Sequence, residues 1–77
     1  MADLIYQLLI TLIASTVEPS HQRHSLLSWL EIARQNEGMG EKGRLAYHAL
    51  CDSYALAEQM GLPDKILEPM RHWRAMH

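Results

Sequence analysis

The N-terminal segment of the chain is apolar around most of a helical circumference. Within residues 3–16, polar side chains recur every four positions, at Gln7, Thr11 and Ser15. Nearly all of the remaining positions in this segment are apolar. A spacing of four places the polar residues on one narrow stripe of a helix, and Asp3 is a suitable N-cap residue. A surface helix of a monomer needs only about a third of its circumference apolar. The pattern therefore predicts a helix that is covered by neighbours on several sides.

A second helix is predicted over residues 20–36. Pro19 restricts the residue before it to extended conformations and favours the start of a new helix. The apolar positions that share one face of this helix are Leu26, Leu27, Trp29, Leu30 and Ala33. Ile32 falls on the opposite, polar face, so we expect it to be exposed and to point weakly to a second contact surface.

Glycine and proline mark the limits of two further helices. Gly38, Gly40 and Gly43 lie close together and predict a loop, in which Gly38 can end the second helix in a left-handed conformation. The third helix is predicted over residues 41–60. Its small residues, which would let another helix approach closely, are Ala46, Ala49, Ser53 and Ala57.

The last helix is predicted over residues 64–76. Gly61 suits a left-handed helix end, and Pro63 prevents the third helix from continuing. Pro69 lies inside the fourth segment and removes a backbone donor, which predicts a kink or a restart there. The sequence thus predicts a single all-α domain over residues 1–77, built as a small bundle of four helical segments.

The length of the chain makes self-association the expected source of extra stability. A chain of 77 residues forms a small core, and its single cysteine, Cys51, excludes an intramolecular disulfide. We therefore expect a homodimer, with the first helix in the subunit interface. A central core helix in a monomer is the alternative interpretation of the same pattern. The predicted interface residues are Leu4, Ile5, Leu8, Leu9, Leu12 and Ile13.

No pattern of reactive residues indicates catalysis or a cofactor. Cys51 lies within a helix next to tyrosines, and the glycine loop lacks the preceding strand of a phosphate-binding loop. The five histidines form no metal-binding motif. We predict neither enzymatic activity nor a bound metal or cofactor.

The apolar start of the chain does not resemble a targeting or membrane segment. The run over residues 4–14 is shorter than the roughly 20 residues that span a bilayer, and no basic residue precedes it. The expectation is a cytoplasmic protein without membrane association.

Residues 55–70 resemble the helix-turn-helix motif of DNA-binding proteins. Ala57 stands where that motif has a small residue, Gly61 follows four positions later at the turn, and Leu62 takes the place of the buried turn residue. Leu67 and Met70 match inward positions of the second helix. The resemblance covers about a quarter of the chain.

This resemblance implies a DNA-binding regulator that uses residues 55–74, with the helix that starts near Asp64 in the major groove. The charge pattern of the helix opposes that function, because Asp64 and Glu68 would face phosphates and Pro69 interrupts the recognition helix. The net charge of the whole chain is −2. DNA binding is therefore the alternative function.

The favoured function is that of an interaction module, an adaptor, small inhibitor or regulator, that binds a partner protein. Trp and Arg are enriched at binding hot spots, and Met adapts to irregular surfaces. The C-terminal segment concentrates these residue types, so the predicted partner-binding residues are Met70, Arg71, Trp73 and Arg74. The alternative is that Ile66, Met70 and Trp73 close the core against the third helix. Arg71, His72 and Arg74 would then remain outside as a basic patch for an acidic partner.

Overall fold

The computed structural model describes residues 2–38 and 43–76, and these residues form helices joined by short connections. The four helices are α1 (Ala2–Thr16), α2 (His21–Asn36), α3 (Gly43–Gln59) and α4 (Asp64–Ala75). The described residues contain no strand. The predicted all-α class and the four segments are confirmed; the predicted start of the third helix at residue 41 lies outside the described residues.

A polar side chain caps the N-terminus of α2, whereas the acidic residue near the N-terminus of α1 bonds to other side chains. Ser20 is the N-cap of α2, and its hydroxyl accepts a hydrogen bond of 3.0 Å from the backbone N–H of Arg23. Asp3 is not the N-cap of α1, because the helix already begins at Ala2. The Asp3 carboxylate lies in the first turn instead, where it accepts hydrogen bonds from Gln7 and Arg34.

Gly61 ends α3 in the predicted left-handed conformation, with φ of 69°. Its N–H donates to the carbonyl of Glu58 at 3.0 Å, and the N–H of Leu62 donates to the carbonyl of Ala57 at 3.2 Å. These two bonds form a Schellman motif, which satisfies carbonyls that the helix leaves without partners. The motif reverses the chain and places Leu62 against the core.

Of the two outcomes predicted at Pro69, a kink or a restart, the restart is wrong. α4 is continuous over Asp64–Ala75 with Pro69 inside it. The proline removes the hydrogen bond that the carbonyl of Lys65 would otherwise accept. Both residues lie on the exposed side of the helix, where water can bind that carbonyl and the proline ring faces away from the core.

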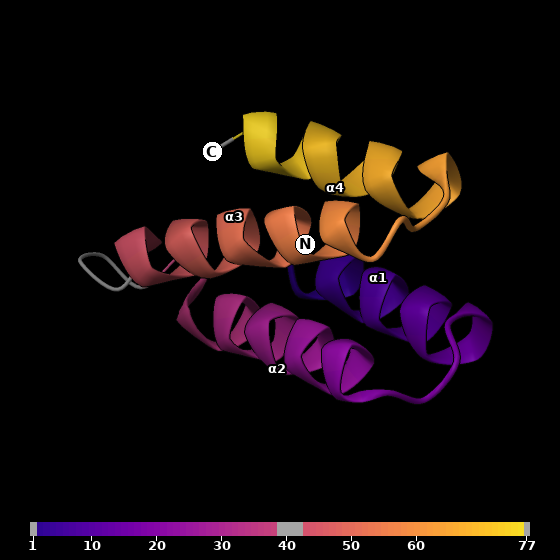
Figure 1. Cartoon of the computed structure of the whole chain (residues 1–77). Helices are drawn as coiled ribbons and strands as arrows, with labels where there is room; N and C mark the ends of the chain where they lie inside the picture. The colour runs from indigo at the N-terminus through magenta and orange to yellow at the C-terminus, as the bar shows by residue number, and fades with distance from the viewer. Residues whose placement is uncertain (1, 39–42, 77) are drawn as a thin grey trace.

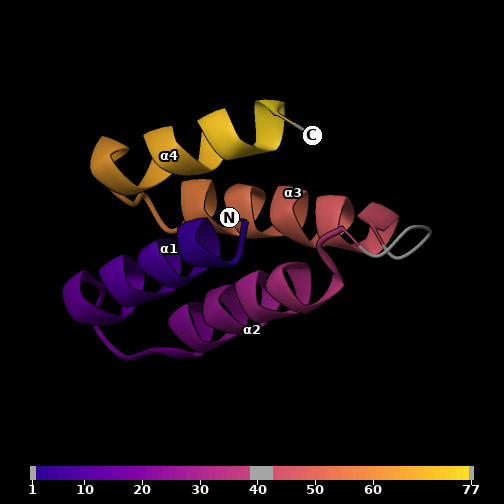
Figure 2. The same cartoon turned by 180° about the vertical axis from the view of Figure 1, so that it is seen from behind.

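The helices form a four-membered ring in which chain direction alternates (Figure 1). Each helix contacts its neighbours along the chain, and α4 closes the ring by packing against α1. The view from behind shows the same order, with α4 folded back alongside α3 (Figure 2). The contact between α2 and α3 is the most extensive of these. The buried small residues Ala33, Ala49 and Ser53 fit that close approach, as the sequence predicted for the third helix.

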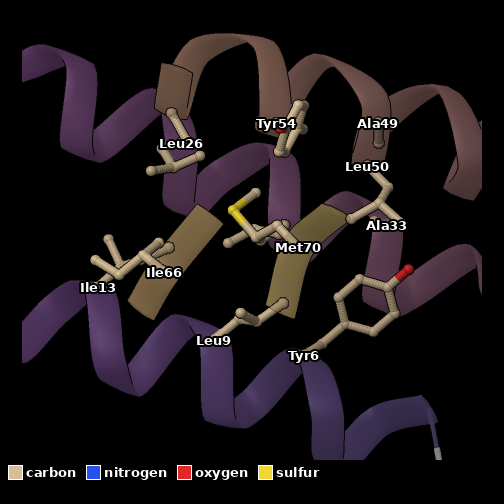
Figure 3. Close-up of a cluster of buried hydrophobic side chains, with 12 residues drawn as sticks. Tyr6, Leu9, Ile13, Leu26, Ala33, Ala49, Leu50, Tyr54, Ile66 and Met70 are labelled. Carbon is tan, nitrogen blue, oxygen red and sulfur yellow. The ribbon is translucent and has the colours of Figure 1, made fainter. Parts of the chain in front are cut away.

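The core lies inside the ring and takes side chains from all four helices. Figure 3 shows Met70 at its centre, between Leu9 and Ile13 of α1 and Tyr54 of α3. The buried apolar residues of this cluster are Tyr6, Leu9, Ile13, Leu26, Leu30, Ala33, Ala49, Leu50, Tyr54, Ala57, Ile66 and Met70.

The cap of α2 gives a first test of this structure. We expect Ser20→Ala to lower the free energy of unfolding by about 1 kcal/mol, because the N–H of Arg23 loses its acceptor. Urea denaturation followed by circular dichroism measures the change. Ser28→Ala removes the same hydroxyl from an exposed position inside α2 and should leave stability unchanged or slightly higher. Equal losses in both variants would contradict the assigned cap.

Candidate functional site

Ion pairs occupy the side of the bundle formed by α1 and α2. The Nη1 atom of Arg34 lies 2.7 Å from Oδ1 of Asp3, and the same guanidinium pairs with Glu31. Hydrogen bonds to Glu31 and Asp3 raise the pKa of Arg34, and the bond from Arg34 lowers the pKa of Glu31. Arg23 donates to the carbonyls of Ala14 and Val17. The charged groups of Asp3, Glu31, Arg34 and Arg23 therefore all have partners within α1, α2 and the turn between them.

The opposite flank of α1 carries leucines on the outside. Leu4 is 59% exposed and Leu8 is 61% exposed, while Ile5 and Leu12 are half-buried. Asp3 marks the side of α1 that faces α2, because it pairs with Arg34. Residues 5, 8 and 12 lie on the other flank of the same helix, which is the side of α4. We call Leu4, Ile5, Leu8 and Leu12 the α1 outer face.

Two of the predicted interface residues belong to the protein's own core. Leu9 is almost fully buried and Ile13 is fully buried, both within the ring of four helices. They cannot contact a second subunit across an intact surface, so their assignment to the interface is wrong. The remaining four predicted residues are the α1 outer face, whose role in dimerisation stays a prediction.

A second group of exposed apolar side chains lies on the face formed by α2 and α3. Ile32, which was expected to be exposed, is 41% exposed, and Trp29 is exposed to a similar degree although it was placed on the buried face. On α3, Leu45 is 55% exposed. Arg34 faces α1 and Tyr54 faces α4, so these three residues point to the remaining side of both helices.

The face formed by α3 and α4 carries an arrangement of arginine and tyrosine. Nε of Arg71 donates to the hydroxyl of Tyr54 at 2.9 Å, and Nη1 of Arg71 lies 2.8 Å from a carboxylate oxygen of Glu68. The guanidinium carbon of Arg74 lies 4.4 Å from the centroid of the Tyr54 ring. Hydrogen bonding to Tyr54 raises the pKa of Arg71, so this arginine stays charged.

The two apolar residues of the predicted partner site point inward. Met70 has no exposed surface, so its assignment to a binding surface is wrong. Trp73 is half-buried and packs edge-on against the Tyr6 ring, with the ring centroids 5.9 Å apart. The burial of Tyr6 raises its pKa. Both residues thus help to close the core, as the alternative interpretation had it, but Trp73 contacts Tyr6 of α1, which that interpretation did not predict. Arg71 and Arg74 remain at the surface.

Tyr54 is the member of the α3–α4 face that the sequence did not identify. Arg71 and Tyr54 are 17 positions apart, and their contact depends on how α4 folds back along α3. The turn at Gly61 was readable in the sequence, and it determines which turns of α3 and α4 lie side by side. The spacing of Tyr54 from that turn was the available signal.

The structure also shows which residues of the segment that resembles a helix-turn-helix are buried and which are exposed. Met70 and Leu67 face inward, fully and partly buried, as the motif's pattern implies. The exposed first half of α4 carries Asp64 and Glu68 beside Lys65. A phosphate backbone approaching this end of α4 would meet two carboxylates and one amine.

Within residues 2–38 and 43–76, no three His, Cys, Asp or Glu side chains converge as a metal site would require. The same residues enclose no pocket. None of their helices combines the length and the apolar character needed to cross a bilayer.

Comparison with known proteins identifies no relative of this chain. No protein-family model matches the chain, and no curated protein or solved structure is significantly similar to it.

Proposed function

We propose that the protein is a non-enzymatic interaction module that works as a homodimer, with the α1 outer face as the subunit interface. The observation that carries this proposal is the exposure of Leu4 and Leu8, about three fifths each, one helical turn apart on the same side of α1. Burying a leucine side chain fully contributes about 1.5–3 kcal/mol relative to leaving it exposed. A second copy that covers both residues recovers part of that free energy from each subunit.

The charge pattern of α1 suits a second copy of the same chain. In a symmetric dimer, the same patch meets itself, so a charge near the twofold axis faces its own kind. Asp3 is the only charged side chain in α1, and it points toward Arg34 of α2. The α1 outer face can therefore meet its copy without repulsion between like charges.

The hydroxyl groups next to this face already have hydrogen-bond acceptors. Ser15 donates to the carbonyl of Thr11 at 2.8 Å, and Thr16 donates to the carbonyl of Leu12 at 2.6 Å. A buried donor without a partner costs about 1–3 kcal/mol. Covering the C-terminal part of α1 leaves neither hydroxyl in that state, so Ser15 and Thr16 do not oppose the association.

The double variant Leu4→Gln with Leu8→Gln tests the proposed interface. We expect the parent protein to have about twice the 8.9 kDa mass of one chain and the variant to have the mass of one chain, while both keep the same helical content. Light scattering coupled to gel filtration measures the mass. The matched control, Ile32→Gln with Leu45→Gln, removes apolar area from the α2–α3 face and should stay dimeric. If the control dissociates while the Leu4 and Leu8 variant stays dimeric, the interface lies on the α2–α3 face and not on the α1 outer face.

A further inference from the structure

Two arginines of α4 are held in place by one tyrosine of α3. Tyr54 is buried, and its hydroxyl accepts from Nε of Arg71. The guanidinium carbons lie 5.8 Å (Arg71) and 4.4 Å (Arg74) from the centroid of its ring. An arginine that is fixed before binding loses less conformational freedom when it forms hydrogen bonds with a ligand. The structure therefore presents guanidinium groups that are already ordered.

The two arginines differ in how their charge is satisfied. Arg71 pairs with Glu68 at 2.8 Å, whereas among the described residues Arg74 forms no ion pair with a carboxylate. Arg74 is half-buried against the tyrosine ring, so part of its hydration is already removed. The planar edge of a guanidinium matches the two oxygens of a carboxylate. Arg74 is thus the group on this face that is best prepared to bind one.

An exposed tyrosine lies beside the arginines. Tyr47 is 40% exposed and lies two helical turns before Tyr54 on the same side of α3. A hydrogen bond with Cys51 raises the pKa of Tyr47, against a smaller opposite effect of the positive charge of Arg74. The ring of Tyr47 offers an apolar contact next to the charged group. We call Tyr47, Tyr54, Arg71 and Arg74 the Arg–Tyr patch.

We propose that the Arg–Tyr patch binds an acidic peptide segment of a partner protein, with a carboxylate on Arg74 and a neighbouring apolar side chain against Tyr47. This inference rests on the proposed function in treating the protein as an interaction module, but it concerns a different face from the α1 outer face. A peptide fits better than a nucleic acid, because a phosphate backbone needs several cations along its path. Next to the patch, α4 carries the carboxylate of Glu68, which pairs with Arg71, and the exposed carboxylate of Asp64.

The experiment titrates the whole protein, labelled with nitrogen-15, with a short oligoglutamate peptide that is acetylated and amidated. We expect the Nε–H signals of Arg71 and Arg74 and the backbone signal of Tyr47 to shift, and an oligoglutamine peptide of equal length to leave them in place. Arg74→Gln should weaken binding roughly tenfold or more, since it removes a charge-assisted hydrogen bond. Lys65→Gln removes the same charge from another part of α4 and should weaken binding less than Arg74→Gln does.

Three results would overturn the proposal: unmoved arginine signals, equal weakening by Lys65→Gln and Arg74→Gln, or tighter binding of an oligothymidylate of matched charge at the same salt concentration. Arg74→Lys keeps the charge but loses the planar edge, so it should also bind more weakly than the parent. If Arg74→Gln fails to fold, the titration of the parent protein and the binding of the Arg74→Lys variant test the proposal. Peptide binding by a protein of monomeric mass would refute the dimer and leave the Arg–Tyr patch supported.

Discussion

Met70→Ala should lower the free energy of unfolding by about 2–5 kcal/mol, because the substitution leaves a cavity at the centre of the core. Met70 is fully buried among side chains of α1 and α3 (Figure 3). A chain of 77 residues has a total stability of about 4–12 kcal/mol, so the loss is a large fraction of it. Chemical denaturation followed by circular dichroism measures the change.

Met76→Ala is the matched control for this substitution. The chemical change is the same, but Met76 lies just beyond α4 and is 64% exposed. Exposed substitutions usually change stability by less than about 0.5 kcal/mol. A Met70→Ala variant as stable as Met76→Ala would contradict the burial of Met70 and reopen its role as a surface contact.

Leu9→Asp should unfold the protein. Leu9 is almost completely buried between α1 and α4, and a carboxylate placed there would have neither water nor a positive partner. An unpaired charge at such a site costs several kcal/mol, which is comparable with the stability of a small domain. Loss of helical circular dichroism at room temperature and the absence of a cooperative thermal transition are the expected observations.

Leu8→Asp, one position earlier, should give a different result. The side chain of Leu8 is 61% exposed, so a carboxylate there remains in water when the protein is monomeric. The variant should keep its helical spectrum while losing the dimer, because two carboxylates would face each other across the proposed interface. A folded Leu9→Asp variant, or an unfolded Leu8→Asp variant, would contradict the orientation of α1 in the bundle.

The helix limits could be predicted because they depend on local chemistry. Ser20 caps α2 through a hydroxyl and a backbone N–H only three residues apart. Gly61 ends α3 because glycine adopts a positive φ without steric cost. Such features need no knowledge of the tertiary structure. The restart predicted at Pro69 is wrong for a reason that is not local: its position on the outer side of α4 lets the helix continue through it.

The orientation of α1 could not be predicted from its pattern. Leu8 and Leu9 are equally apolar neighbours on a helix whose apolar arc covers most of its circumference. Only the packing of α2 on one flank, where Arg34 pairs with Asp3, and of α4 on the other determines which leucine is buried. Asp3 and Arg34 are 31 positions apart, so their pairing is not visible in any local window.

The predicted partner site was partly wrong for the same kind of reason. Trp73 and Met70 were predicted to bind a partner because of their residue types. Their large apolar side chains also suit the closure of a small core, where the structure places them. The contact of Arg71 and Arg74 with Tyr54 depends on how α4 folds back on α3. The arginines of the proposed Arg–Tyr patch were therefore predicted from the sequence, whereas the contact of Tyr54 with them was visible only in the structure.

Sedimentation equilibrium of the unmodified protein, from low micromolar to several hundred micromolar concentration, shows directly whether the chain self-associates. We expect a reversible transition from one chain of 8.9 kDa to two, with the dimer dominant at the upper concentrations. A mass of one chain across the whole range would contradict self-association through α1, and Leu4 and Leu8 would then be exposed leucines of a monomer.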